Sequence, residues 1–179
     1  KWLTDAKRYF SKRNCAAKGL SDKYIKADPN RQELLEKALM GICGFQGIDN
    51  ITEYMSIHKS DDDADELWQY FQDVINWVQK IFPKYYNDMK GLDWCSLYNK
   101  YHNNTYNSSA MKTEVEKLHQ DDEVQKRKGI YEYLLCKDKD PFAGRLLNLR
   151  AFDNRDKMAV YERQQGLCNI CGEHFEYDE

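Results

Sequence analysis

Residues 60–83 read SDDDADELWQYFQDVINWVQKIFP, which is the clearest helical pattern in the chain. Its apolar residues recur every three or four positions, which is the spacing of one face of an α-helix. Ser60 is the expected N-cap, the aspartates after it suit the positive end of the helix dipole, and the proline at the end stops the pattern. We expect four members of the apolar stripe to form the centre of the core: Trp68, Phe71, Ile75 and Val78.

Further helices are predicted on both sides of this stretch. Their ranges are 2–14, 27–44, 91–102 and 108–120, and residues 128–136 suit a further apolar helix or a buried turn. Asp28 and Pro29 mark the start of the second range, and Gly44 or Gly47 marks its end. The sequence therefore predicts a mainly α fold, with a multi-helix connector domain at residues 1–140.

A turn-rich segment, KDKDPFAGR at residues 137–145, predicts the domain boundary. The chain after it, residues 141–179, starts with a stretch at 146–152 that suits an extended strand. A helix is then predicted over residues 153–166.

This last predicted helix has recognisable ends. Asp153 is the expected N-cap, and Gly166 is the expected stop. Its inward side chains are expected to be Met158, Val160 and Tyr161.

Composition limits the classes of function. The chain has 179 residues, of which 41% are hydrophobic and 32% are charged, as in a soluble folded protein. No stretch approaches the ~18 consecutive apolar residues that span a bilayer, and nothing resembles a secretory leader. We therefore predict a cytoplasmic protein without a membrane partner. The net charge of −3 means that any contact with nucleic acid needs a local basic patch.

Cys168 and Cys171, in the stretch CNICG, have the spacing of a zinc-binding turn. Two thiolates so spaced can reach one Zn²⁺ ion, but a structural zinc takes four ligands, so the pair supplies half of a site. His174 could be a third ligand, although an exposed position in the turn is the simpler interpretation. Two alternatives stay open: a redox-active pair, which more often begins a helix after a buried strand, and two cysteines without a shared role.

The run LNLRAFDNRDKMAVYERQQGLCNICGEHF, residues 147–175, resembles the beginning of an HNH endonuclease domain. There, an arginine-bearing helix ending in a YERQ-x-G-x-C-x-x-C-G pattern leads into the first zinc-binding turn of a ββα-metal nuclease. Upstream, the resemblance extends to the helical region of bacterial restriction-type proteins, over residues 6–19, 27–39, 67–101 and 128–136. In that family a ParB-like, GmrSD-type N-terminal domain precedes the helices and a C-terminal HNH domain.

The resemblance implies that residues 141–179 are the start of an HNH domain, in which Cys168 and Cys171 are the first ligand pair of a structural zinc. The family's catalytic histidine, an asparagine and a second Cys-x-x-Cys would follow Glu179, and His174 does not match that histidine. The chain is therefore expected to stop inside the nuclease domain and to be inactive alone. In the complete site, the histidine would act as general base on water beside a divalent ion such as Mg²⁺.

The implied function is hydrolysis of DNA phosphodiester bonds in restriction or phage defence. The implied partners are DNA and an N-terminal nuclease or NTPase-like domain of the same protein. Four basic side chains near the cysteine pair are candidates for phosphate contacts that do not depend on DNA sequence: Arg150, Arg155, Lys157 and Arg163. The alternative is that they only keep their helix soluble. The alternative function is a helical interaction or interdomain relay module, in which zinc is a structural clip.

Overall fold

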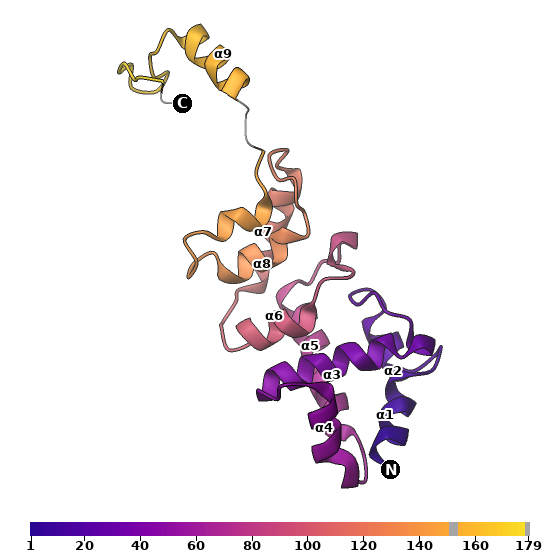
Figure 1. Cartoon of the computed structure of the whole chain (residues 1–179). Helices are drawn as coiled ribbons and strands as arrows, with labels where there is room; N and C mark the ends of the chain where they lie inside the picture. Colours follow the sequence, from indigo (N-terminus) through magenta and orange to yellow (C-terminus); the bar gives the residue numbers. More distant parts are fainter. Residues whose placement is uncertain (151–153, 178–179) are drawn as a thin grey trace. The chain divides into compact units, whose positions relative to one another are not determined.

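The computed structural model describes residues 1–150 and 154–177. The chain divides into two compact units, residues 1–148 and residues 149–179. The first unit is built from α-helices, coloured indigo to orange in Figure 1. They are α1 (Trp2–Phe10), α2 (Ala16–Ser21), α3 (Glu33–Gln46), α4 (Ile51–Ile57), α5 (Asp65–Ile81), α6 (Trp94–Tyr101), α7 (Ser108–Gln120) and α8 (Gly129–Cys136). The predicted mainly α fold class is confirmed.

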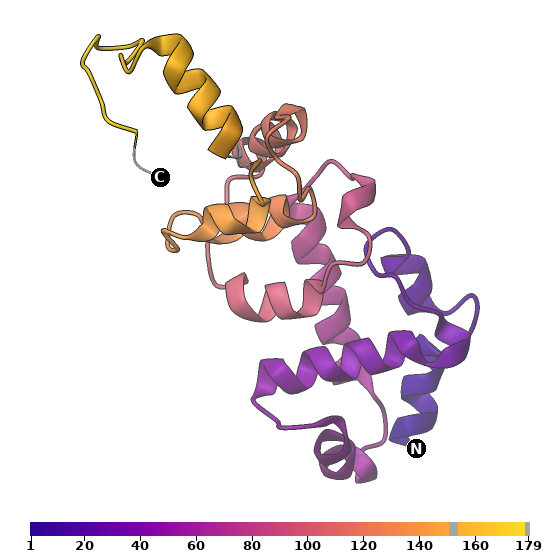
Figure 2. The same cartoon turned by 45° about the horizontal axis from the view of Figure 1, so that its top comes forward.

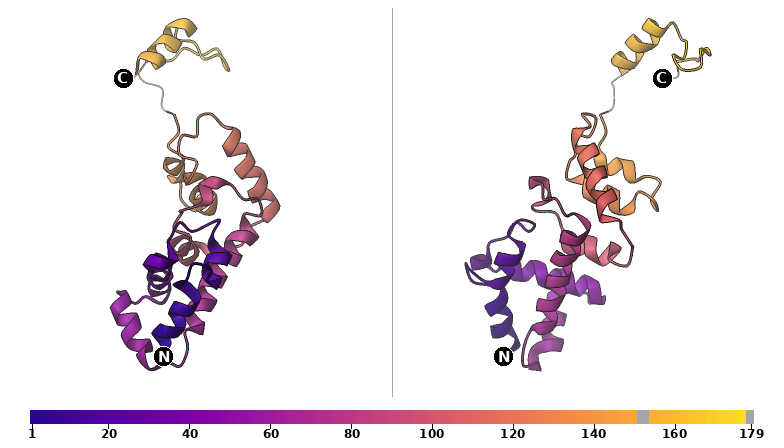
Figure 3. Two further views of the ribbon diagram at one scale, coloured as in Figure 1. Left: turned by 90° about the vertical axis from the view of Figure 1, so that its right-hand side faces the viewer. Right: turned by 180° about the vertical axis from the view of Figure 1, so that it is seen from behind.

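Helix α5 is the centre of the first unit. It contacts α2, α3 and α6, and Figures 2 and 3 show α3 and α6 crossing it. Phe71, Ile75 and Val78 of α5 are completely buried, as their spacing predicted. Burial of such a stripe is the main source of stability for a helix of this kind.

Trp68 does not lie at the centre of the core as predicted. It is half-buried and packs against the edge of the core. Its indole stacks on the ring of Tyr9 in α1, with centroids 5.0 Å apart and planes 4° from parallel. Tyr9 is itself half-buried, so the pair closes the rim of the core rather than filling its centre.

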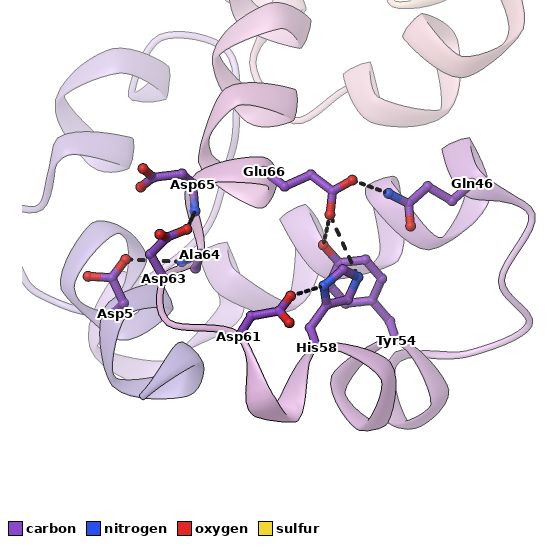
Figure 4. Close-up of polar contacts among 9 residues, drawn as sticks. All are labelled: Asp5, Gln46, Tyr54, His58, Asp61, Asp63, Ala64, Asp65 and Glu66. Atoms are coloured by element: carbon purple, nitrogen blue, oxygen red, sulfur yellow. Dashed lines mark hydrogen bonds and ion pairs between the residues drawn. The ribbon is translucent and has the colours of Figure 1, made fainter.

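The start of α5 also differs from the prediction. Ser60 ends a short 3₁₀ helix, η2 (His58–Ser60), and the N-cap of α5 is Ala64. Alanine has no capping side chain, and the N–H of Ala64 donates instead to the carboxylate of Asp5 in α1 at 3.1 Å. The cap is thus supplied by a distant helix, which sequence spacing alone does not reveal (Figure 4).

Asp28 caps a different element from the one expected. Its side chain accepts a hydrogen bond from the N–H of Asn30 within the 3₁₀ helix η1 (Pro29–Arg31), and α3 begins later, after Gln32. The other end of α3 follows the second of the two predicted stops, since Gly47 adopts the left-handed conformation there with φ +72°.

The boundary between the units lies after Asn148, eight residues beyond the predicted one. Residues 143–147 form a 3₁₀ helix, η4 (Ala143–Leu147), in place of the start of a predicted strand. Leu147 is buried, and its carbonyl accepts a hydrogen bond from the N–H of Lys126 at 3.0 Å. Residues 141–148 therefore belong to the helical unit, because η4 packs against α8.

The second unit consists of α9 (Asn154–Gln164) and the turn that follows it. Gly166 has φ +71° just after the helix, as its predicted role as a stop requires. Met158 and Val160 are exposed, contrary to the inward positions predicted for them, whereas Tyr161 is half-buried and contacts the rings of Phe175 and Tyr177. The predicted cap, Asp153, lies outside the described residues.

Strand structure in residues 154–177 is limited to one isolated antiparallel bridge between Leu167 and His174. The ββα part of an HNH domain is thus not formed by these residues. Within the described ranges, no helix combines the length and apolar character that a membrane crossing requires.

Candidate functional site

The cysteine pair lies in a tight turn that backbone hydrogen bonds close. The N–H of Cys168 donates to the carbonyl of Glu173 at 2.8 Å, and the N–H of Gly172 donates to the carbonyl of Cys168 at 2.7 Å. Gly172 has φ +75°, a conformation that glycine adopts without strain. The turn places the thiol of Cys171 within hydrogen-bond reach of the sulfur of Cys168.

The electrostatics of the turn favour a thiolate. Backbone N–H groups of Cys171 and then Ile170 point at the sulfur of Cys168, and with the thiol of Cys171 they hold the pKa of Cys168 below its usual value of 9.0. Hydrogen bonds to the charged form of a group have this effect in general. A thiolate is the form that binds zinc, so the local geometry suits a metal ligand.

Aromatic side chains fasten the turn to α9. The ring of Tyr161 meets those of Phe175 and Tyr177, each with a centroid separation of 5.5 Å. The N–H of Phe175 donates to the carbonyl of Gly166 at 2.9 Å, and the hydroxyl of Tyr177 donates to the carbonyl of Asn154 at 3.2 Å. The arrangement positions the cysteines relative to the helix before them. Sequence reasoning placed Tyr161 inward but did not find its two aromatic partners.

His174 does not join the two cysteines. Its ring lies against Gly166, where an added Cβ would come within 2.9 Å of Nε2. Among the described residues, no three histidine, cysteine or acidic side chains are grouped so that they could hold a metal. The residues present thus fit half of a tetrahedral zinc site, and His174 is not placed as its third ligand.

The predicted phosphate-binding residues lie on the surface of the second unit. Arg150, Arg155, Lys157 and Arg163 are all exposed. In the described part of the chain, none of the four makes an ion pair with a carboxylate. Lys157 follows Arg155 by two positions, so the two project from different faces of α9. Arg150 precedes α9, so the four basic side chains do not share one face of the helix.

A second polar cluster, which sequence reasoning missed, lies in the first unit around Glu66 (Figure 4). Its carboxylate accepts hydrogen bonds from Nε2 of Gln46 at 2.8 Å and from the hydroxyl of Tyr54 at 3.4 Å. Nε2 of His58 lies 3.6 Å from the same carboxylate, and Nδ1 of His58 lies 2.7 Å from Asp61. The three-residue spacing of His58 and Asp61 was visible in the sequence, whereas the contacts with Glu66 join α3, α4 and α5.

The Glu66 cluster is backed by aromatic rings. His58 is largely shielded from solvent and contacts the rings of Trp2 and Tyr54, at centroid distances of 6.2 and 4.2 Å. Burial raises the pKa of Tyr54, and the charge of Glu66 adds to the shift, so its phenol remains a neutral donor. Both ring nitrogens of His58 face carboxylates rather than a serine or cysteine that the ring could activate as a nucleophile. The cluster serves to hold Glu66 in place at the start of α5.

Comparison with known proteins identifies no family for this chain. No protein-family model matches the chain, and neither the curated proteins nor the solved structures include a match to it. The functional assignment therefore rests on the motifs and the local geometry.

Proposed function

We propose that this chain is part of an HNH-type DNA endonuclease of the restriction or phage-defence type. In this proposal the first unit is a helical connector, and the second unit carries the lead-in helix and the first zinc-binding turn of the nuclease domain. One observation carries the proposal: the Cys168 thiol is held by backbone N–H groups in a turn that suits a zinc ligand.

Zinc would be structural in this assignment. Cys168 and Cys171 would bind it as thiolates, and the ion would supply rigidity to a loop that has little core of its own. Two further ligands are needed, and the domain that the sequence resembles provides them from a second Cys-x-x-Cys. The exposed Arg155, Lys157 and Arg163 on α9 would meet phosphate groups and give affinity without sequence preference.

The decisive test compares this chain with a form extended along its native reading frame through a second Cys-x-x-Cys. We expect the extended form to cleave plasmid DNA with Mg²⁺ present and to hold one zinc per chain, while the 179-residue chain does neither. Cys168→Ser in the extended form should remove both the zinc and the cleavage.

A matched control is Cys136→Ser, which alters a buried thiol of the first unit and should leave zinc content unchanged. Tight binding of one zinc by the 179-residue chain would contradict the half-site assignment. Zinc-free cleavage by the extended form would contradict the nuclease assignment.

A further inference from the structure

A hollow on the first unit, where α3, α5 and α6 meet, has no role in the proposed nuclease function. It has a volume of about 260 Å³. Three aromatic rings and two carboxylates dominate its lining: Phe45, Tyr70, Tyr98, Glu66 and Asp73. None of these residues lies in the second unit, so binding at the hollow does not depend on the zinc-binding turn.

The aromatic side of the hollow is rigid and partly open to solvent. The ring of Phe45 lies 5.4 Å from that of Tyr70 and 5.9 Å from that of Tyr98, and it is 45% exposed. Tyr70 is fixed because its hydroxyl donates to Oδ1 of Asn99 at 2.9 Å, while Nδ2 of Asn99 donates to the carbonyl of Gly41 at 2.8 Å. A large apolar side chain left this exposed beside fixed rings is available for contact with a ligand.

The two carboxylates lack a permanent positive partner. Throughout residues 1–148, no lysine or arginine lies within ion-pair distance of Glu66 or Asp73; His58 is the sole basic neighbour of Glu66, and Asp73 accepts a hydrogen bond from Gln69. The position of Glu66 is set by its own contacts with Gln46 and Tyr54 (Figure 4). Burial, and after it the charge of Asp73, raises the pKa of Tyr98, which reflects the closeness of that carboxylate to the ring. The hollow is therefore an electronegative site.

We infer that this hollow binds the side chain of a lysine or arginine presented by a protein partner. A cation beside the exposed ring of Phe45 is attracted by the negative face of that ring, and Glu66 and Asp73 attract its charge directly. His102 is stacked on one face of Tyr98, with centroids 4.7 Å apart, so Tyr98 contributes to the wall of the hollow. A phosphate group is repelled by the two carboxylates, and a purely aliphatic side chain leaves their charges without a partner. Recognition of an ammonium group among aromatic rings is an established use of such a surface.

The binding test uses short capped peptides, Gly-Lys-Gly and Gly-Arg-Gly, titrated into the isotope-labelled chain and followed by NMR. The matched control peptide carries norleucine, which keeps the aliphatic stem of lysine and lacks the ammonium group. We expect saturable shifts of the Phe45 and Tyr98 signals with the lysine and arginine peptides, and no saturable shift with norleucine.

Two variants separate this site from general attraction to acidic surface. Asp73→Asn and Phe45→Leu change exposed side chains and should each weaken binding of the lysine peptide about two- to fivefold. Glu36→Gln removes one exposed negative charge from the other end of α3 and should leave binding unchanged. Equal binding of the norleucine peptide would overturn the inference. So would equal losses in Asp73→Asn and Glu36→Gln, or shifts centred on residues 61–65.

Discussion

The backbone of Gly129 in α8 lies against the carbonyl group of Leu146, so closely that a Cβ atom at Gly129 would stand 1.7 Å from that oxygen. The obstructing atom belongs to the backbone, so a change of rotamer cannot relieve the clash. Glycine at this position allows η4 to reach α8, which is why the helical unit continues to Asn148.

Gly129→Ala should therefore destabilise the first unit by about 3 kcal/mol or more, since η4 must move away from α8. The measurement is denaturant unfolding followed by tryptophan fluorescence. Gly144→Ala is the matched control, because an added Cβ there meets nothing within 4 Å, and its effect should stay within about 1 kcal/mol. Similar unfolding midpoints for the two variants would mean that η4 does not dock as described.

Phe71→Ala should cost roughly 3–5 kcal/mol, because its ring is completely buried and meets Phe10 at a centroid distance of 5.2 Å. Thermal or chemical unfolding measures this directly. Asn76→Ala, at an exposed position of the same helix, should change stability by less than about 0.5 kcal/mol. An unaltered melting temperature in Phe71→Ala would show that α5 does not supply the centre of the core.

The cysteines should differ in reactivity toward an alkylating reagent. Burial raises the pKa of Cys43 and Cys136, and it raises that of Cys95 to about 12, whereas hydrogen bonds from backbone N–H groups lower the pKa of Cys168. Because the thiolate is the reacting form, brief treatment near neutral pH should modify Cys168 more than about tenfold faster than these three buried thiols. Peptide mass mapping after a timed quench measures the rates. Comparable labelling of Cys95 in the folded chain would contradict its burial.

His119 should make stability depend on pH. Burial lowers its pKa below the ordinary 6.5, and the carboxylate of Asp88, 3.8 Å from Nδ1, offsets this only in part. The folded chain then binds fewer protons at this site than the unfolded chain, so the stabilising contribution is present above pH 6.5 and is lost as pH falls through the lowered pKa.

His119→Gln should flatten this decline, which unfolding curves at a series of pH values between about 7 and 5 would measure against the parent chain. His58→Gln is a control for loss of a histidine elsewhere in the first unit. If His119→Gln and the parent chain lose stability in parallel below pH 6.5, the histidine is not held neutral by burial.

Local sequence patterns predicted the long helices well, because the residues that recur at helical spacing are also the residues that the helix buries. The apolar stripe of α5 is an example, since Phe71, Ile75 and Val78 needed no knowledge of other helices. The short α4 (Ile51–Ile57) was not predicted, because seven residues offer too few repeats to define a face. The 3₁₀ helix η4 was not predicted: residues 143–145 were assigned to a turn-rich linker and residues 146–147 to the start of a strand, because its conformation depends on contact with Gly129 in α8.

The cysteine turn and the hollow also differ in how far the sequence could predict them. The cysteine turn was predictable because its two cysteines are three positions apart and its glycine follows directly. The hollow was not, because Phe45, Asp73 and Tyr98 come from three helices and meet only after packing. Residues on separate helices have no fixed spacing in the sequence, so no sequence pattern predicts that they meet.

The division after Asn148 also provides separate spectroscopic reporters in one molecule. All four tryptophans, Trp2, Trp68, Trp77 and Trp94, lie in the first unit, whereas the cysteines that are not buried, Cys168 and Cys171, lie in the second. Intrinsic emission therefore follows the helical unit, and a dye attached at a thiol follows the turn after α9. The unfolding of each unit can therefore be followed at its own emission wavelength in a single sample of the intact chain.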